Sequence, residues 1–246
     1  MLMTAIALVA MVSCNKDDNK NKGNKNNGGL EETELIAIDG SFDDWASLKG
    51  AATAEVDEDA PYPGLLSMKA IADATNIYIY FEYELQEDQG GAAPFSIYVN
   101  SDNACSTGSA YWMWAGDADE FGEGEPVIPG IDYLLASDGG FIASETAVKS
   151  MDDIALLEFT GKDGEDIWTE GALVEKEVTS FFENAGKIQN GVVIMEVSFM
   201  RSVINCNKSG ATKIGILVQN AAWGVGGVLP VGASAGAVEM LEVALP

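Results

Sequence analysis

The chain has 246 residues, 39 acidic against 13 basic side chains, a formal net charge of −26 and no histidine. The negative field excludes nucleic-acid binding, which depends on Lys and Arg at phosphates, and it repels anionic lipid head groups. The lack of histidine excludes Ser-His-Asp and Cys-His catalysis, His-ligated zinc and His-ligated haem.

The first fourteen residues are typical of a secretory signal. Residues 1–13 are almost wholly apolar, too few for a transmembrane helix, which needs about 20 residues, but suited to the hydrophobic part of a signal peptide. No basic residue precedes Leu2, so we expect a few basic residues upstream of Met1. The segment Met11-Val12-Ser13-Cys14 resembles a bacterial lipobox, which implies that Cys14 is acylated. The alternative is an ordinary cleaved signal with an incidental cysteine.

Residues 14–29 are expected to form a lipidated cysteine and a flexible tether. Residues 15–29 contain only Asn, Lys, Asp and Gly, so they have no apolar surface to offset their chain entropy. The run Asn15-Lys16-Asp17-Asp18 resembles the surface-export signal of Bacteroidota lipoproteins. Together these features predict a lipid anchor in the outer membrane, with the protein facing the cell surface.

Two further cysteines remain once Cys14 is acylated. Cys105 and Cys206 both lie in polar, turn-like surroundings, and an oxidising compartment would allow them to pair. A disulfide between them and two separate buried thiols are both open. Their spacing matches no metal motif.

Residues 30–246 are expected to form one all-β domain, a jelly-roll-like antiparallel β-sandwich of about a dozen strands. Short runs of β-branched and aromatic residues recur between clusters of Gly, Asp and Asn, the pattern of a sandwich. A turn of helix is expected around residues 199–205. The predicted strands are 34–38, 66–72, 76–85, 95–99, 110–114, 131–136, 140–145, 154–160, 167–174, 192–199, 213–219 and 238–244.

The segment 77–84 has the clearest alternation. One face of this strand is expected to point into the core, and it carries Ile77, Ile79, Phe81 and Tyr83. The opposite face carries Tyr78 and Tyr80. These two tyrosines are either covered by another part of the chain or form part of a ligand platform.

Three motifs occur in order along the domain. They are Asp39-Gly-Ser-Phe-Asp43-Asp44-Trp45, then Ala72-Asp-Ala-Thr-Asn-Ile-Tyr-Ile-Tyr80, then Ile97-Tyr-Val-Asn-Ser-Asp102. This order resembles the family-9 carbohydrate-binding modules and the wider DOMON-like sandwiches, over most of residues 36–220. The resemblance implies a sugar-binding sandwich that uses aromatic side chains and holds structural calcium. A haem-binding DOMON role would need Met ligands, because no histidine is present.

The first motif is expected to be architectural. Asp39-Gly40 suits a tight turn, because Gly is free at positive φ and Asp can bond nearby backbone N–H groups. Trp45 then provides a large anchor for the core or for one end of the sandwich.

The segment 110–115 is the strongest candidate for a ligand platform. On a strand, Trp112 and Trp114 would share one face, while Tyr111 and Met113 would share the other. Both faces of such a strand would be apolar, although a sandwich strand normally has one face in water. One of the two pairs of side chains must therefore be covered by another part of the chain or by a ligand. Outward indoles would suit the C–H faces of sugar rings; the alternative is that both tryptophans are core or loop-covered.

A glycine-rich segment supplies a second candidate. Trp223 follows a predicted strand within residues 220–227 and could close over a ligand, with Asn220 bonding hydroxyl groups; alternatively, Trp223 plugs one end of the sandwich. The run lacks the Lys-Ser/Thr of a phosphate loop.

An acid-rich segment follows the Trp-containing one. Residues 117–125 hold five carboxylates, of the kind that bind Ca²⁺, although their spacing fails the EF-hand pattern. The expected ligands are Asp117, Asp119, Glu120 and Glu123. The alternative is a solvated acidic loop.

The sequence therefore predicts a non-catalytic, carbohydrate-binding surface lipoprotein. The expected partner is a glycan, with a neighbouring surface protein as a further candidate, and membrane contact is only through the lipid on Cys14. The ligand-binding residues are expected to be Tyr78, Tyr80, Trp112, Trp114, Asn220 and Trp223. The alternative function is an adhesive or structural surface protein that binds a protein partner through an apolar aromatic patch. No motif marks a catalytic pair of carboxylates, so no enzyme is expected.

Overall fold

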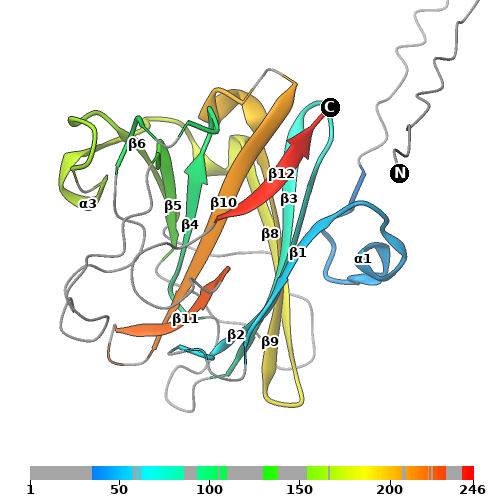
Figure 1. The fold of residues 1–246 in the computed structure, drawn as a ribbon. Helices are drawn as coiled ribbons and strands as arrows, with labels where there is room; N and C mark the ends of the chain where they lie inside the picture. Colours follow the sequence, from blue (N-terminus) through cyan, green and yellow to red (C-terminus); the bar gives the residue numbers. More distant parts are fainter. Residues whose placement is uncertain are drawn as a thin grey trace, which may run out of the picture. The chain divides into compact units, whose positions relative to one another are not determined.

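Two antiparallel β-sheets face each other and enclose the main core of the domain (Figure 1). The computed structural model describes residues 35–57, 60, 62–85, 93–104, 106–109, 130–137, 154–165, 167–206, 209–220, 222, 224–230 and 240–246. All of them belong to the unit Glu34–Pro246. The prediction of an all-β sandwich is confirmed.

The five-stranded sheet has the order β1-β2-β3-β9-β8. Its strands are β1 (Ala52–Glu55), β2 (Leu65–Ala72), β3 (Asn76–Glu84), β8 (Phe182–Gln189) and β9 (Val192–Met200). The seven-stranded sheet has the order β11-β10-β4-β5-β6-β7, and β12 also pairs with β10. Its strands are β4 (Phe95–Asn100), β5 (Tyr133–Ser137), β6 (Ile154–Phe159), β7 (Gly171–Leu173), β10 (Gly210–Gln219), β11 (Val225–Leu229) and β12 (Leu241–Leu245).

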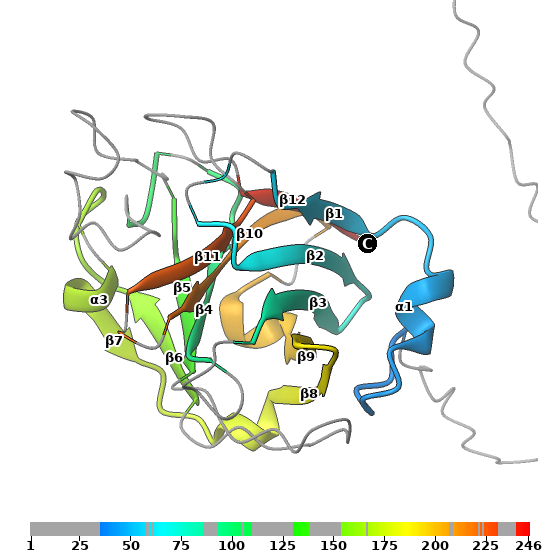
Figure 2. The same ribbon diagram turned by 90° about the horizontal axis from the view of Figure 1, so that it is seen from below.

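Short helices lie between these strands. They are α1 (Asp43–Ser47), α3 (Ile167–Glu170) and the 3₁₀ helices η2 (Val178–Ser180) and η3 (Arg201–Ile204). The helix η3 confirms the turn expected at residues 199–205. Figure 2 shows α1 on the outer side of the five-stranded sheet, away from the seven-stranded one.

Some predicted strands are wrong and others were missed. Residues 35–38 are not a strand, and the predicted strand 167–174 is the helix α3 followed by the three-residue β7. Strands β1, β8 and β11 were missed because their alanines, glycines and charged residues blur the alternation on which the prediction rests. The predicted strands 110–114 and 140–145 lie outside the described residues.

Alternation decides which side chains form the core. Ile77, Ile79, Phe81 and Tyr83 of β3 are at most 1% exposed and pack with inward residues of β4, β9 and β10, as predicted from the sequence. Burying one such side chain contributes about 1.5–3 kcal/mol. The core therefore holds the two sheets together and fixes which face of each strand points outward.

The segment 36–45, hereafter the N-terminal clasp, is fastened to the outer side of the five-stranded sheet. Glu196 of β9 is fully buried, and its carboxylate accepts hydrogen bonds from Asp39 N (2.9 Å), Gly40 N (2.6 Å) and Trp45 Nε1 (3.0 Å). Gly40 has a φ of 80°, which explains the glycine in the motif. Burial raises the pKa of Glu196, and these donors oppose the rise.

The turn between β2 and β3 explains the second motif. Asp73 Oδ1 accepts hydrogen bonds from Thr75 N (2.8 Å) and Asn76 N (2.7 Å), and Oδ2 accepts one from the Tyr78 hydroxyl (2.7 Å). The Arg201 guanidinium donates to the Asp73 carbonyl oxygen (2.6 Å). Burial raises the pKa of Asp73, but the donated hydrogen bonds outweigh it and hold the pKa below 3.8.

Replacing the clasp carboxylate should destabilise the whole domain. We expect Glu196→Gln to lower the free energy of unfolding by about 2–3 kcal/mol, because an amide cannot accept three buried N–H donors in this arrangement. Urea unfolding followed by tryptophan fluorescence measures the change. The control is Glu183→Gln at an exposed position of β8, and equal stability of the two variants would contradict the role given to Glu196.

The turn should make stability depend on pH. Because the folded pKa of Asp73 is lowered, its contribution is present above the unfolded pKa and is lost as the pH falls through the folded pKa. We therefore expect Asp73→Asn to be less stable than wild type at neutral pH, with the difference shrinking as the pH drops below 3.8. The midpoints of urea unfolding for wild type and Asp73→Asn, taken at several pH values across this range, measure the stability difference. The control is Glu175→Gln at an exposed position. A stability difference between wild type and Asp73→Asn that does not change with pH would contradict the prediction.

Candidate functional site

The outer face of the five-stranded sheet is closed by the N-terminal clasp. Tyr78 and Tyr80 are only 1% and 8% exposed, and they pack against Ile36, Ile38 and Trp45. Of the two interpretations open at the sequence level, the structure shows the covered one. The expectation that these tyrosines bind ligand is therefore corrected: they are the floor on which the clasp sits.

Both hydroxyl groups are also occupied within the chain. The Tyr78 hydroxyl donates to Asp73, and the Tyr80 hydroxyl donates to Glu82 in a short hydrogen bond. Burial, and after it the Glu82 carboxylate, raises the pKa of Tyr80 above its ordinary value. Lys69 Nζ lies 5.2 Å from the centroid of the Tyr80 ring, a cation–π contact that further fixes the ring.

Asn220 organises its own loop. It follows β10, on the other sheet from the two tyrosines, so these predicted ligand residues do not form one site. Its Oδ1 accepts hydrogen bonds from Ala222 N and Gly224 N, both at 2.9 Å. A role in bonding a ligand's hydroxyl groups would compete with these contacts.

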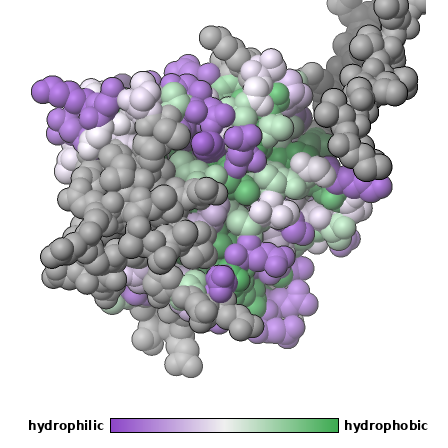
Figure 3. Space-filling view, viewed as in Figure 1, coloured by the Kyte–Doolittle hydropathy of each residue, from purple (hydrophilic) through white to green (hydrophobic). Residues whose placement is uncertain are grey.

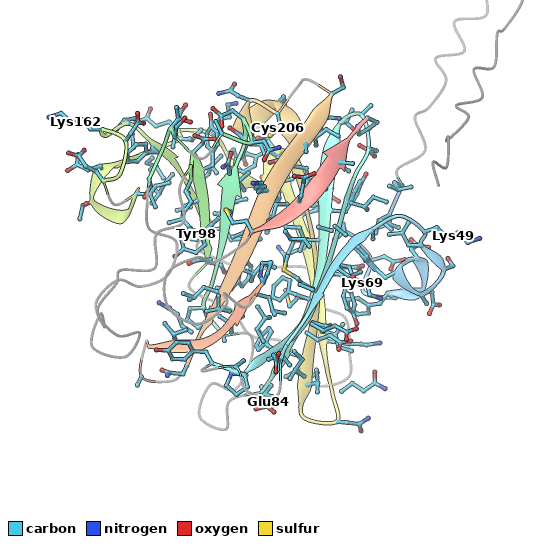
Figure 4. All side chains as sticks on the ribbon, viewed as in Figure 1. Lys49, Lys69, Glu84, Tyr98, Lys162 and Cys206 are labelled. Carbon is cyan, nitrogen blue, oxygen red and sulfur yellow. The ribbon has the colours of Figure 1, made fainter. Side chains whose placement is uncertain are left out.

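The outer face of the seven-stranded sheet also carries buried apolar side chains. Tyr98, Leu134, Leu217 and Val228 point away from the main core and are at most 4% exposed. Together with Ile131, Ile167 and Met240 they form what we call the outer cluster. Tyr98 lies on β4 (Figure 4). Strand β4 is thus buried on both sides, unlike a strand of an ordinary sandwich sheet with one face in water.

The residues that flank the segment carrying Trp112 and Trp114 meet beside this cluster. Ser109 and Ile131 form an isolated antiparallel bridge, with Ser109 N donating to Ile131 O (2.9 Å) and Gly130 N donating to Ser109 O (3.1 Å). Ser109 Oγ also accepts a hydrogen bond from Ile167 N (3.1 Å). Since Ile131 and Ile167 both belong to the outer cluster, Ser109 joins the bridge to that cluster.

A polar corner lies at the end of β4. Asp132 Oδ2 accepts hydrogen bonds from Ser101 N and Ser101 Oγ, both at 2.7 Å. Burial, with the Asp102 charge as a lesser cause, raises the pKa of Asp132, and the Ser101 donors oppose it. Asn100 is fully buried at this corner. Asn100 belongs to the third motif of the sequence analysis, but neither Asn100 nor Asp132 was predicted as a site residue, because each is one polar residue at a strand end.

Cys206 belongs to the same end of the domain (Figure 4). It is a free thiol, 2% exposed, and its Sγ donates to the Ser101 carbonyl oxygen (3.3 Å). Burial raises the pKa of this thiol, so it is not activated as a nucleophile. Cys105 lies outside the described residues. Because Cys206 is a free thiol, the possible disulfide between Cys105 and Cys206 is corrected to a separate buried thiol at Cys206.

Most of the other predicted sites also lie outside the described residues. They are Cys14, Trp112, Trp114, Asp117, Asp119, Glu120, Glu123 and Trp223. In the part of the chain that is described, no group of three or more His, Cys, Asp or Glu side chains could hold a metal ion. That part also contains no helix long and apolar enough to cross a membrane.

Comparisons with known proteins give no relative from which a function could be transferred. No protein-family model and no curated protein sequence matches the chain.

Proposed function

We propose that the chain is a non-catalytic, carbohydrate-binding lipoprotein, anchored through acylated Cys14 in the outer membrane and facing the cell surface. A sugar ring stacks on Trp112 and Trp114, and Trp223 is a further candidate for contact with it. The lipobox-like sequence, the polar tether and the acidic composition support this placement. Calcium at the acidic segment 117–125 belongs to the same proposal.

The observation that carries the proposal is the bridge between the residues on either side of residues 110–129. Ser109 and Gly130, which flank this segment, are hydrogen-bonded to each other at the bridge between Ser109 and Ile131. The scaffold at this bridge is rigid, because Ser109 and Ile131 are fully buried. Binding residues occur disproportionately on loops that such a scaffold positions.

The described residues give no support to the alternative of a protein partner, and the aromatic segment that would carry its patch lies outside them. Its exposed large apolar side chains are Leu35, Leu173 and Met200, which lie before α1, on β7 and at the end of β9. On the face shown in Figure 3, hydrophobic and hydrophilic residues are interspersed. A protein interface of the expected kind would instead need a contiguous apolar patch of several hundred Å².

A glycan array and affinity-gel screen of the full chain, with and without Ca²⁺, tests the proposal. We expect glycan binding in wild type and at least about a tenfold loss, about 1.4 kcal/mol, in Trp112→Ala or Trp114→Ala, because a stacking surface is removed. Leu173→Ala, which removes an exposed apolar side chain on β7, should bind as wild type.

Each variant's thermal unfolding midpoint shows whether it is folded. Loss of binding in a folded tryptophan variant supports the proposal. Absence of glycan binding by wild type, or unchanged binding by both tryptophan variants, contradicts it. If wild type binds no glycan and both variants unfold, the tryptophans are core residues and the protein-partner function becomes the better hypothesis.

A further inference from the structure

The N-terminal clasp has an apolar core of its own. Its residues Ile36, Ile38 and Trp45 pack with Tyr78 and Tyr80 in a cluster that is separate from the main core. The main core lies between the two sheets, and none of the clasp's side chains belongs to it. Loss of the clasp's packing would therefore leave the packing between the sheets intact.

The hydrogen bonds that fasten the clasp converge on one side chain. Glu196 accepts all three of them, from Asp39 N, Gly40 N and Trp45 Nε1. Among the described residues, no backbone–backbone hydrogen bond joins the clasp to a strand, and its other side-chain hydrogen bonds run between clasp residues. A paired strand is bonded at intervals along its whole length, whereas the clasp is fastened at a single carboxylate.

Release of the clasp would not strand a buried charge. Glu196 lies between Tyr80 and Ala185 across the strands, and both of these residues belong to the clasp's cluster. The clasp thus covers the carboxylate as well as supplying its donors. When the clasp leaves, water reaches the carboxylate and replaces the lost N–H groups, so Glu196 escapes the penalty of an unpaired buried ion.

The chain on either side of the clasp permits such a movement. Residues 48–51 link α1 to β1, and Gly50 within them has a φ of 84° with nothing within 4 Å of an added Cβ. A glycine in open space readily absorbs a change of backbone direction. On the other side, Leu35 is 40% exposed. A pull from the N-terminal side reaches the clasp before any described strand.

We propose that the clasp is a releasable strap. It leaves the five-stranded sheet as one unit while the sandwich stays folded, turns about residues 48–51, and frees residues 35–51, about 60 Å of extended chain. Local opening of this kind occurs in elements that share few contacts with the main core. Its use in extending the domain's reach from a membrane rests on the proposed acylation of Cys14, whereas release itself does not.

Native-state hydrogen exchange of the full chain, followed by NMR at rising urea concentrations, tests the proposal. We expect the amides of Asp39 and Gly40, corrected for intrinsic rates, to exchange at least about tenfold faster than the ladder amides of β3. Their rates should hardly change with urea, because releasing the clasp exposes little surface, whereas the β3 amides should accelerate steeply. Equal protection and equal urea dependence of the two sets would overturn the proposal, because the clasp would then open only with global unfolding.

Two variants separate the clasp from the core. Glu196→Gln should accelerate exchange of the Asp39 and Gly40 amides by about tenfold or more, because hydrogen bonds to a charged acceptor are lost. Ile77→Val, at a fully buried position of the main core, should accelerate the β3 amides about two- to tenfold and leave the clasp amides unchanged. Acceleration of both sets by the same factor in Ile77→Val contradicts the proposal. The wild-type comparison decides the question even if a variant does not fold.

Pulling the full chain between its two ends in optical tweezers examines release under load. We expect a first extension of about 60 Å before the main unfolding event, at a lower force in Glu196→Gln than in wild type. If the sandwich unfolds with no earlier extension of this length, or if the force of that extension is the same in both proteins, the clasp is not a strap that yields to tension.

Discussion

The buried carboxylate of Glu196 is the constraint on which the outer side of the five-stranded sheet depends. A charge without exposure is costly unless hydrogen bonds replace its hydration, and here Asp39 N, Gly40 N and Trp45 Nε1 do so. The exchange is mutual, because the same bonds satisfy backbone N–H groups that have no strand partner. Glu196 therefore holds the clasp on the sheet, as a ladder of backbone hydrogen bonds would hold a further strand.

This constraint decides which surfaces remain for function. With the clasp in place, Tyr78 and Tyr80 are interior residues, and Lys187 Nζ lies 4.8 Å from the centroid of the Phe42 ring at the clasp's edge. The outer side of the five-stranded sheet is thus covered by the clasp and has a structural role. The outer side of the seven-stranded sheet carries the outer cluster, and this cluster includes Ile131 of the bridge with Ser109.

The sequence predicted the parts of the fold that local pattern controls. Alternation in β3 identified the inward residues correctly, because one buried face imposes a period of two. It could not say whether Tyr78 and Tyr80 were covered, since their cover comes from residues some forty positions earlier in the chain. Strand β8 was missed because its run Phe182-Glu-Asn-Ala-Gly-Lys-Ile-Gln lacks the hydrophobic alternation of a half-buried strand, and its place is set by pairing with β9.

The same distinction separates the polar residues that the sequence identified from those it did not. Acid-rich and Trp-rich segments are conspicuous in a sequence, whereas Asn100 and Asp132 are single polar residues at two strand ends about thirty positions apart. Only the register of β4 against β5 brings them together, and only the bond from Nδ2 to Ala104 shows which amide atom lacks a partner.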